Sequence, residues 1–438
     1  MTRLHVHTLG CKVNQVEGEG IAGRAAAGGV RPVSDAAEAD VIVLNSCAVT
    51  RAADLEAAKL ARRYRRANPD AVIVLTGCYA QVRPAEAARL PVDYVVGHGG
   101  KDALAGEIAA MAARGRRASA EVRVAPIYRD RRLPVLPPEP GPAPDRTRRI
   151  VKVQDGCDVF CSFCIVPHAR GLPRSIPAEA ALAEIAGHVA RGVREIVLTG
   201  PHIGSWGRDL SPPDTLASLL RRVRLEGGVS RLRLSSMEPS EFDDAVIDEI
   251  SRHADVYCEH LHVPLQSGSD AVLRRMRRPY DTARFRDLTE RFARALPRLG
   301  LGTDVIAGFP GETRAEFEET YTLLEASPVS FFHVFPFSPR PGTPAAKHPN
   351  QVPTPLIRAR AARLRALGLR KAREFYGRFM GERLEVLLET RLDDGCYRGY
   401  SRNYIPVEVS GERLAANTLV QAKLVSAVEG RVRGEAVG

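Results

Sequence analysis

The sequence GCDVFCSFCIVPHARG at residues 156–171 places three cysteines, Cys157, Cys161 and Cys164, within eight positions of one predicted loop. Three thiolates at these spacings can bind three irons of one cubane iron–sulfur cluster. The fourth iron then has no protein ligand and is available to a small molecule. The alternative is a zinc loop, but cysteine zinc sites are usually closed by four ligands in C-x2-C pairs. The stretch therefore predicts a [4Fe–4S] cluster with an open iron, and these three cysteines as catalytic residues.

The region around this loop, residues 146–375, alternates apolar strands with helical stretches. Six strand–helix units predict an α/β fold with a partial (β/α)6-type parallel barrel, whose chemistry lies at the C-terminal ends of the strands. The cysteine loop directly follows the first strand and therefore lies at such an end. The predicted strands are RIVKVQ, REIVLTG, RLRLSS, EHLHVPL, GTDVIAG and FFHVFPF.

The first segment, residues 1–120, shows the same alternation and predicts an α/β domain with a parallel sheet. Cys11, Cys47 and Cys78 each follow the end of an apolar strand, in TLGC, LNSC and LTGC. Because the carboxyl ends of parallel strands share one edge, the three can meet in the crevice where such folds bind ligands. A single cysteine is more often a small buried hydrophobe. Recurrence at the same strand offset instead favours a second three-cysteine metal site, again a [4Fe–4S] cluster.

Two further segments differ in composition and period. Residues 121–145 hold prolines at 137, 138, 140, 142 and 144, which prevent regular backbone hydrogen bonding and predict an extended linker. Residues 379–438 alternate at period two and predict a small antiparallel β-barrel. Such barrels often bind oligonucleotides, but they also serve as inert caps. Nine acidic against eight basic residues in this tail give no support to a binding role.

The composition of the whole chain limits the class of protein. No apolar run approaches the roughly 20 residues needed to span a bilayer, and the first residues lack a signal-peptide pattern, so we expect a cytoplasmic protein with no membrane partner. In that compartment eight cysteines indicate metal or catalysis before disulfides, and Cys258 and Cys396 are assigned to packing. The net charge of +11 suits a polyanionic partner, although 56 arginines against 7 lysines also fit a biased genomic base composition.

The CxxxCxxC loop resembles that of the radical-SAM superfamily. The resemblance implies that the open iron binds S-adenosylmethionine (SAM), which one electron from the cluster cleaves to a 5′-deoxyadenosyl radical. Phe163 matches the aromatic residue that packs beside the adenine in that family. Over almost the whole chain, further motifs resemble the methylthiotransferases, and the tail is similar to their TRAM module. These motifs are TLGCKVN at 8–14, NSCAVT at 45–50, TGCYAQ at 76–81, LSSMEP at 234–239, HVPLQSGSD at 262–270, TDVIAGFPGET at 303–313 and FPFSPRPGTPA at 335–345.

The family resemblance implies a division of labour between two clusters. One SAM methylates a sulfur at the N-terminal cluster, and a second SAM yields the radical that acts on a C–H bond of the substrate. TLGCKVN resembles the branch that modifies C2 of N6-threonylcarbamoyladenosine in the tRNA anticodon loop; the isopentenyladenosine branch usually has GCQMN here, and the ribosomal-protein branch GCPKN. The expected partners are the tRNA anticodon loop, a reducing electron donor and a sulfur source. The alternatives are isopentenyladenosine in tRNA, a ribosomal protein, or a non-catalytic iron–sulfur RNA sensor.

Residues at the ends of the later barrel strands are further candidates for binding SAM. Thr199 and Gly200 end the second strand, where the superfamily contacts the methionine part of SAM, and Gly308 would let the adenine approach the backbone. For each polar candidate the alternative is a strand-end residue that only satisfies a loop. The complete set is Phe163, Thr199, Gly200, Ser235, Ser236, Glu238, Gln266, Asp304 and Gly308. The lone Trp206 could equally be a packing residue.

Contacts to RNA phosphates are expected from an arginine-rich helix at residues 356–378, with a second cluster at Arg274, Arg275, Arg277 and Arg278. For any single arginine the alternative is a solvated surface. The bases of the helix are Arg358, Arg360, Arg363, Arg365, Arg370, Lys371, Arg373 and Arg378.

Overall fold

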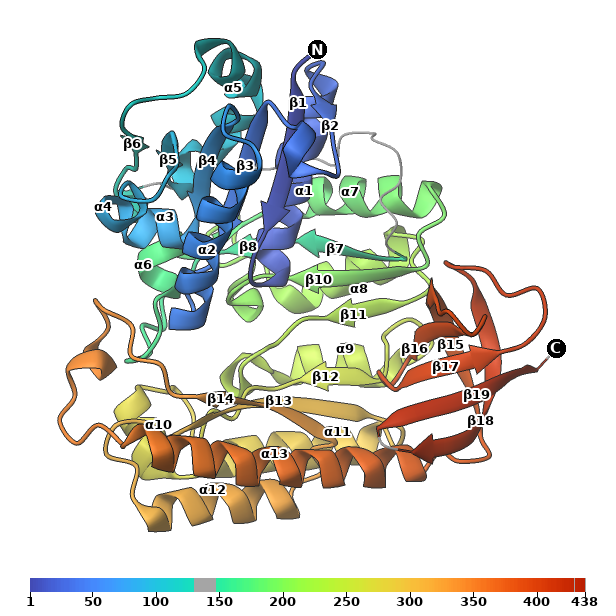
Figure 1. Cartoon of the computed structure of the whole chain (residues 1–438). Coiled ribbons are helices and arrows are strands. Elements are labelled where there is room, and N and C mark those ends of the chain that lie inside the picture. Colours follow the sequence, from blue (N-terminus) through green and yellow to red (C-terminus); the bar gives the residue numbers. More distant parts are fainter. Residues whose placement is uncertain (130–146, 429, 438) are drawn as a thin grey trace.

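A computed structural model describes residues 1–129, 147–428 and 430–437. Figure 1 shows three parts, an N-terminal α/β part at the top, a central α/β part below it, and a C-terminal β-barrel at one side. The prolines on which the predicted linker rests lie outside the described residues.

The N-terminal part is a six-stranded sheet in the order β2-β1-β3-β4-β5-β6, and every pair in it is parallel. Alternate residues of its central strands belong to two separate apolar clusters, one on each face, which confirms the predicted parallel α/β domain. β6 pairs with β5, so the sheet includes the first three residues of the segment predicted as linker. The strands are β1 (Arg3–Thr8), β2 (Arg31–Pro32), β3 (Val41–Ser46), β4 (Val72–Gly77), β5 (Tyr94–Val96) and β6 (Glu121–Arg123).

Helices connect these strands and cover both faces of the sheet (Figure 1). The Thr50 hydroxyl accepts a hydrogen bond from the Ala53 amide at 3.2 Å, which satisfies one free donor and fixes the start of α2. The helices are α1 (Lys12–Ala27), α2 (Arg51–Ala67), α3 (Cys78–Val82), α4 (Pro84–Ala87) and α5 (Lys101–Arg114).

The central part contains the six predicted barrel strands in sequence order. β7, β10 and β11 form one parallel sheet, and β12, β13 and β14 form another. A parallel bridge between Leu232 and Tyr257 joins the two. The result confirms the predicted partial (β/α)6-type barrel. The strands are β7 (Arg148–Lys152), β10 (Glu195–Thr199), β11 (Leu232–Leu234), β12 (His260–His262), β13 (Gly300–Ala307) and β14 (Phe331–Pro336).

Helices pack on the outside of this barrel around one large apolar core. A short antiparallel pair, β8 (Gln154–Asp155) and β9 (Arg174–Ser175), flanks the cysteine loop. The helices are α6 (Val166–Arg170), α7 (Ala178–Ala190), α8 (Leu216–Glu226), α9 (Asp244–Arg252), α10 (Asp270–Met276), α11 (Thr282–Ala295), α12 (Arg314–Ala326) and α13 (Thr354–Gly377).

The C-terminal strands close into a barrel in the order β15-β16-β17-β19-β18. The predicted barrel is confirmed, with one difference, because β17 and β19 pair in parallel and close it. Apolar side chains of alternate residues fill its interior and meet Phe375 and Phe379 at the end of α13. The strands are β15 (Arg383–Arg391), β16 (Tyr397–Ser401), β17 (Pro406–Ser410), β18 (Leu419–Val428) and β19 (Arg431–Val437).

The central part and the C-terminal barrel are joined around the buried carboxylate of Glu195. This carboxylate pairs with Arg231 at 2.9 Å and with Arg233 at 2.8 Å. Arg231 also pairs with Glu385 of β15 at 3.0 Å, and Arg233 donates to the carbonyl of Arg402 at 3.1 Å. Although burial alone would raise the pKa of Glu195, the two guanidinium groups lower it to about 2. The buried charges are therefore fully paired.

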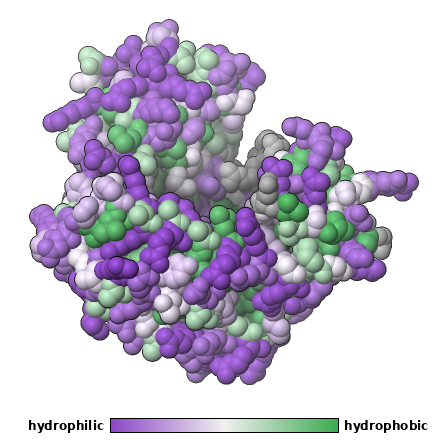
Figure 2. All heavy atoms as spheres, turned by 60° about the horizontal axis from the view of Figure 1, so that its bottom comes forward, coloured by the Kyte–Doolittle hydropathy of each residue, from purple (hydrophilic) through white to green (hydrophobic). Residues whose placement is uncertain are grey.

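The surface is mostly hydrophilic in the view of Figure 2, and it is hollowed between the upper part and the part at the right. Among the described residues, no helix combines the length and the apolar character that crossing a membrane requires.

We expect Glu195→Ala to lower the free energy of unfolding by about 3–5 kcal/mol, because it leaves two buried guanidinium groups without their main partner. Urea denaturation followed by circular dichroism measures this. The matched control is Glu179→Ala, which removes an exposed carboxylate from its pair with Arg222 and should leave the unfolding midpoint unchanged. Equal midpoints for wild type and Glu195→Ala would contradict the role of this pair.

Candidate active site

The central cysteine loop connects β8 to α6 at the C-terminal end of β7. Cys157 and Cys161 are buried and Cys164 is half-buried. Gly156 has a φ of 77°, and a Cβ atom there would lie 2.0 Å from the carbonyl oxygen of Leu172. Only glycine therefore fits at the start of the loop. The fold thus brings the three predicted catalytic cysteines together at the strand end where we expected them.

Burial raises the pKa of all three thiols, and it raises that of Cys164 to about 12. The Arg278 guanidinium donates a hydrogen bond to the Cys161 sulfur at 3.0 Å and opposes this shift. The backbone amide of Val166 donates to the Cys164 sulfur at 3.4 Å. Since a metal binds the thiolate form, buried thiols next to hydrogen-bond donors suit a cationic centre that removes their protons.

The N-terminal cysteines lie at one edge of their sheet, as predicted. Cys11 precedes α1, Cys47 follows β3, and Cys78 begins α3 directly after β4. Gly10 has a φ of 97°, and a Cβ atom there would lie 2.8 Å from the Cys47 sulfur. Close approach of the first and second cysteine segments therefore requires glycine. Burial raises the pKa of Cys78 to about 12, and the Cys78 sulfur lies 3.6 Å from Nε2 of His98.

Neither cysteine trio has the tight ligand spacing that a single metal ion requires. Ligand sulfurs about 2.3 Å from one tetrahedral zinc lie about 4 Å apart. Among the described residues, the group of three ligand atoms found within 4.8 Å of one another is His262, Asp304 and His333, and neither cysteine trio meets that spacing. Three thiolates without a fourth protein ligand suit three corners of a cubane cluster.

A buried ionic network joins the two cysteine regions. Arg170, six residues after Cys164, pairs with Glu17 of α1 at 2.9 Å and with Asp155 at 2.9 Å. Its second amino group donates to Asn14, three residues after Cys11, at 2.5 Å. These contacts tie the loop after β7 to the start of α1. The two cysteine edges are thereby held in one fixed arrangement.

Two lysines complete this network. Lys101 Nζ lies 2.5 Å from Glu17, and Lys152 Nζ lies 3.3 Å from both Glu17 and Asp155. All of these side chains are at most 3% exposed. Burial alone would raise the pKa of Glu17, but the charges of Arg170, Lys101 and Lys152 lower it well below its usual range. The network could not be predicted from the sequence, because its members are far apart along the chain and each looks like an ordinary charged residue.

Several predicted SAM contacts gather beside the central loop. Glu238 pairs with Arg278 at 2.6 Å, and Arg278 contacts the Cys161 sulfur. The Ser235 hydroxyl and one Glu238 carboxylate oxygen are buried without a hydrogen-bond partner among the described residues. Unpaired buried polar atoms are costly, so they fit a polar ligand at this position. Phe163 packs against the apolar cluster that includes Phe309.

Three other candidates, Asp304, Ser236 and Gln266, differ in their surroundings. Asp304 accepts from His262 at 3.0 Å and His333 at 3.3 Å inside the barrel, whereas Ser236 is exposed. Gln266 has a φ of 65°, and its amide donates to the carbonyl of Asp304 at 2.8 Å.

Both predicted glycine contacts have a structural explanation within the protein. A Cβ atom on Gly308 would lie 2.4 Å from the side chain of Ile357 in α13. Gly200 follows the buried Thr199 at the end of β10, and a Cβ atom there would lie 2.7 Å from the side chain of Gln154. Trp206 is buried and donates to the carbonyl of Ile176 at 2.8 Å, so it is a packing residue.

Comparison with known proteins identifies the family. Residues 3–97 match the family described as "Uncharacterized protein family UPF0004", and residues 151–324 match the Radical SAM superfamily. "Threonylcarbamoyladenosine tRNA methylthiotransferase MtaB" of Bacillus subtilis is 39% identical and covers 98% of this chain and 94% of that protein. The chain belongs to the radical-SAM methylthiotransferases. The protein of the same name from Thermotoga maritima is 36% identical over 97% of this chain and 95% of its own length.

Other relatives and a solved structure agree with this membership. "tRNA-2-methylthio-N(6)-dimethylallyladenosine synthase" of Moorella thermoacetica is 33% identical over 98% of this chain and 97% of that protein. The radical S-adenosylmethionine methyltransferase TsrM from Kitasatospora setae, solved with cobalamin and a [4Fe-4S] cluster, has a TM-score of 0.57 at 17% identity. It covers 79% of this chain and 77% of that chain, and it supports the fold alone.

As a radical-SAM methylthiotransferase, the protein uses [4Fe–4S] clusters and SAM, in agreement with the predicted cofactors.

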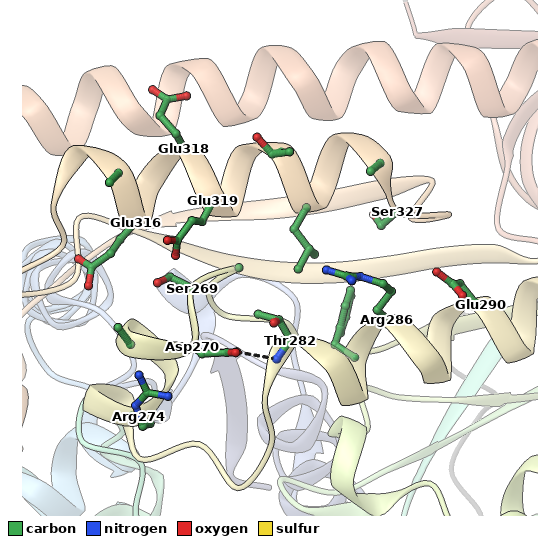
Figure 3. A pocket seen from close by; sticks show the side chains of 17 residues that line it. Ser269, Asp270, Arg274, Thr282, Arg286, Glu290, Glu316, Glu318, Glu319 and Ser327 are labelled. Carbon is green, nitrogen blue, oxygen red and sulfur yellow. Dashed lines mark hydrogen bonds between the residues drawn. The ribbon is translucent and has the colours of Figure 1, made fainter.

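A cavity of about 1050 Å³ lies between α10, α11 and α12 (Figure 3). Glutamates such as Glu316 and Glu319 stand around it, and none of the six cysteines is among its described lining residues.

The arginines predicted to bind RNA are only partly available on this methylthiotransferase. On α13, Arg360 is buried against Glu312 at 2.6 Å, and Arg363 and Arg370 pair with glutamates of α12. The prediction that Arg278 lies on a basic surface is wrong, because this side chain is 3% exposed and belongs to the cysteine site. Sequence spacing could not reveal these tertiary partners.

The lowered pKa of Glu17 gives a test of the network by pH. A carboxyl whose pKa is lower in the folded state stabilises that state above its unfolded value, here 4.5, and loses this contribution as the pH falls. The stability difference between wild type and Glu17→Gln should therefore be constant near neutral pH. Below 4.5 it should shrink by about 1.4 kcal/mol per pH unit. Urea denaturation of the metal-free full chain at several pH values measures it.

The control for this experiment is Glu56→Gln, which removes an exposed carboxylate on α2 that lies 3.7 Å from Lys59. Its effect on stability should not change with pH in the same window. A Glu17→Gln difference that stays constant down to pH 3 would show that Glu17 is not held ionised by the network.

Proposed function

We propose that this protein inserts a methylthio group at C2 of N6-threonylcarbamoyladenosine, beside the anticodon in tRNA. The observation that carries the proposal is the presence of two separate cysteine trios, each at the C-terminal edge of parallel strands and both tied to Arg170 and Glu17. Relatives named for this substrate, at 36–39% identity over nearly the whole chain, support it. The TLGCKVN motif at residues 8–14 supports the same branch.

We assign one cluster to each trio. When bound, the cluster at Cys157, Cys161 and Cys164 supplies the electron that cleaves SAM, and the cluster at Cys11, Cys47 and Cys78 presents the sulfur. The chain's own residues orient these groups. Arg278 donates to the Cys161 sulfur, and Glu238 and Ser235 offer unpaired oxygens for polar groups of SAM. Phe163, Thr199, Gly200, Ser236, Gln266, Asp304 and Gly308 complete the proposed SAM-binding set.

A radical route is required by the substrate. No ordinary side chain is basic enough to remove the hydrogen from C2 of an adenine ring, so a general base at this position would not suffice. The reaction also needs an electron donor and a sulfur source as partners. A tRNA substrate places the protein in the cytoplasm.

Replacing each trio separately tests the division of roles. The protein reconstituted without oxygen should hold about eight irons. Alanine at Cys157, Cys161 and Cys164 should remove about half of this iron and all SAM cleavage. Alanine at Cys11, Cys47 and Cys78 should preserve SAM cleavage and abolish the methylthio product. Iron analysis and chromatography of 5′-deoxyadenosine measure both effects.

Cys258→Ala is the matched control for these variants, because Cys258 is buried but lies outside both trios, 3.8 Å from Glu195. It should retain all of the iron. Methylthio product from the variant lacking Cys11, Cys47 and Cys78 would mean that the sulfur comes from another site.

Nucleoside mass spectrometry of tRNA from cells with and without the protein tests the substrate. We expect the methylthio form of N6-threonylcarbamoyladenosine to disappear from the cells that lack it. Loss of methylthio-isopentenyladenosine instead would move the protein to the branch of the Moorella thermoacetica relative. Unchanged tRNA nucleosides would overturn the proposal and direct attention to a ribosomal protein.

A further inference from the structure

A second cavity, of about 330 Å³, lies where all three parts of the molecule meet. It is lined by Lys12 of α1, by Ile150 of β7 and Val197 of β10, and by Tyr404 between β16 and β17. Ligand pockets typically measure roughly 300–1,000 Å³. We name it the Lys12 cavity. It has room for the side chain of a modified base but not for a folded RNA element.

Tyr404, which lines the Lys12 cavity, is stacked between other rings. Tyr404 stacks on His260 with ring centroids 4.3 Å apart and on Tyr400 at 4.8 Å. The Arg233 guanidinium lies 4.9 Å from the Tyr404 ring, and that of Arg148 lies 4.5 Å from the Tyr400 ring. This part of the lining is therefore preformed, so a ligand meets it without ordering cost.

Of the three described cations that line the cavity, Arg148 and Arg233 form ion pairs, and Lys12 does not. Arg148 is paired with Glu389 at 2.5 Å, and Arg233 is paired with Glu195 at 2.8 Å. Lys12 is exposed to the cavity, and no acidic side chain of the described residues forms an ion pair with it. With Arg148 and Arg233 paired to acids, the unpaired charge of Lys12 leaves the cavity lining net positive, so an anionic ligand is favoured.

The strand register places the cavity two residues before the end of β7 and β10, where the loop with Cys157, Cys161 and Cys164 begins. Val197 of β10 pairs with Ile150 of β7, and two residues further on Thr199 pairs with Lys152, at the strand end that leads to the cysteine loop. Two residues of a strand span about 7 Å. On the other side, Lys12 directly follows Cys11. A base whose reacting carbon lies near the cysteines can thus extend a substituent into the cavity.

We propose that the Lys12 cavity receives the acidic side chain of the modified adenosine, and that Lys12 binds its carboxylate. This inference rests on the proposed function and adds the residue that recognises the substrate's charged group. The apolar side chains of Ile150 and Val197 suit the methyl group of the threonyl substituent. A backbone phosphate of the RNA offers the same negative charge, and the experiment distinguishes the two.

The test compares binding of two anticodon stem-loop RNAs to the full-length protein by fluorescence anisotropy. One RNA carries N6-threonylcarbamoyladenosine, and the other carries its uncharged carboxamide. The wild type should bind the acid about ten-fold more tightly, as expected for a hydrogen-bonded charge pair. Lys12→Gln should bind the two RNAs within about two-fold of each other, and Lys12→Arg, which keeps the charge, should retain most of the preference.

Lys59→Gln is the matched control, since it removes a lysine charge from α2 at a side chain that is 73% exposed. It should keep the wild-type preference. A Lys12→Gln protein that still prefers the acid would overturn the proposal. So would an equal loss of affinity for both RNAs, which indicates a phosphate contact, and so would a wild type that does not distinguish acid from amide.

The proposed function is checked separately by the product that the wild-type enzyme forms on the threonylcarbamoyl RNA and on a third RNA that carries isopentenyladenosine. Methylthiolation of the threonylcarbamoyl RNA together with an unaltered preference in Lys12→Gln would reject the cavity and keep the function. Product only from an RNA with isopentenyladenosine would reject the function itself.

Discussion

The ion pair between Arg170 and Glu17 fixes the relation between the two cysteine regions. The two residues are 153 positions apart in sequence, and each lies within seven residues of a cysteine motif. Charges buried this deeply are stabilising only when every one has a partner, because desolvation is expensive. Lys101, Lys152 and Asp155 supply those partners. A small shift of one part against the other would leave several charges unpaired, so the network acts as a strict positional constraint.

Both cysteine trios follow from one property of parallel sheets, in which all the strands end at the same edge. The N-terminal sheet brings together residues from three separate strand ends, whereas the central loop carries its trio on eight consecutive positions. The network between α1 and α6 sets these two edges against each other. The Lys12 cavity opens beside the same helix start, so the residues proposed for sulfur delivery and for substrate charge are neighbours in the chain.

Much of the fold, and the strand ends at which the candidate site residues lie, could be predicted because the signals are local. The period of the apolar residues indicated the parallel sheets and the C-terminal barrel, and the cysteine spacing indicated the site. The predictions failed where a tertiary partner decides the role of a residue. Arg278 and Arg360 look like surface charges in sequence but are buried against acids. The SAM contact expected at Gly308 stays a prediction, because the close approach of Ile357 by itself also accounts for a glycine there.

The sequence by itself determined which thiols are available, at which strand ends they lie, and to which family the motifs correspond, because these properties depend on order and spacing along the chain. Only the tertiary structure decided which charges are buried together and which remain unpaired. It paired Arg148 and Arg233 with acids and left Lys12 open to the cavity. The physical reason is that the state of a charge depends on its partners and its solvent, and both are assembled from residues far apart in the chain.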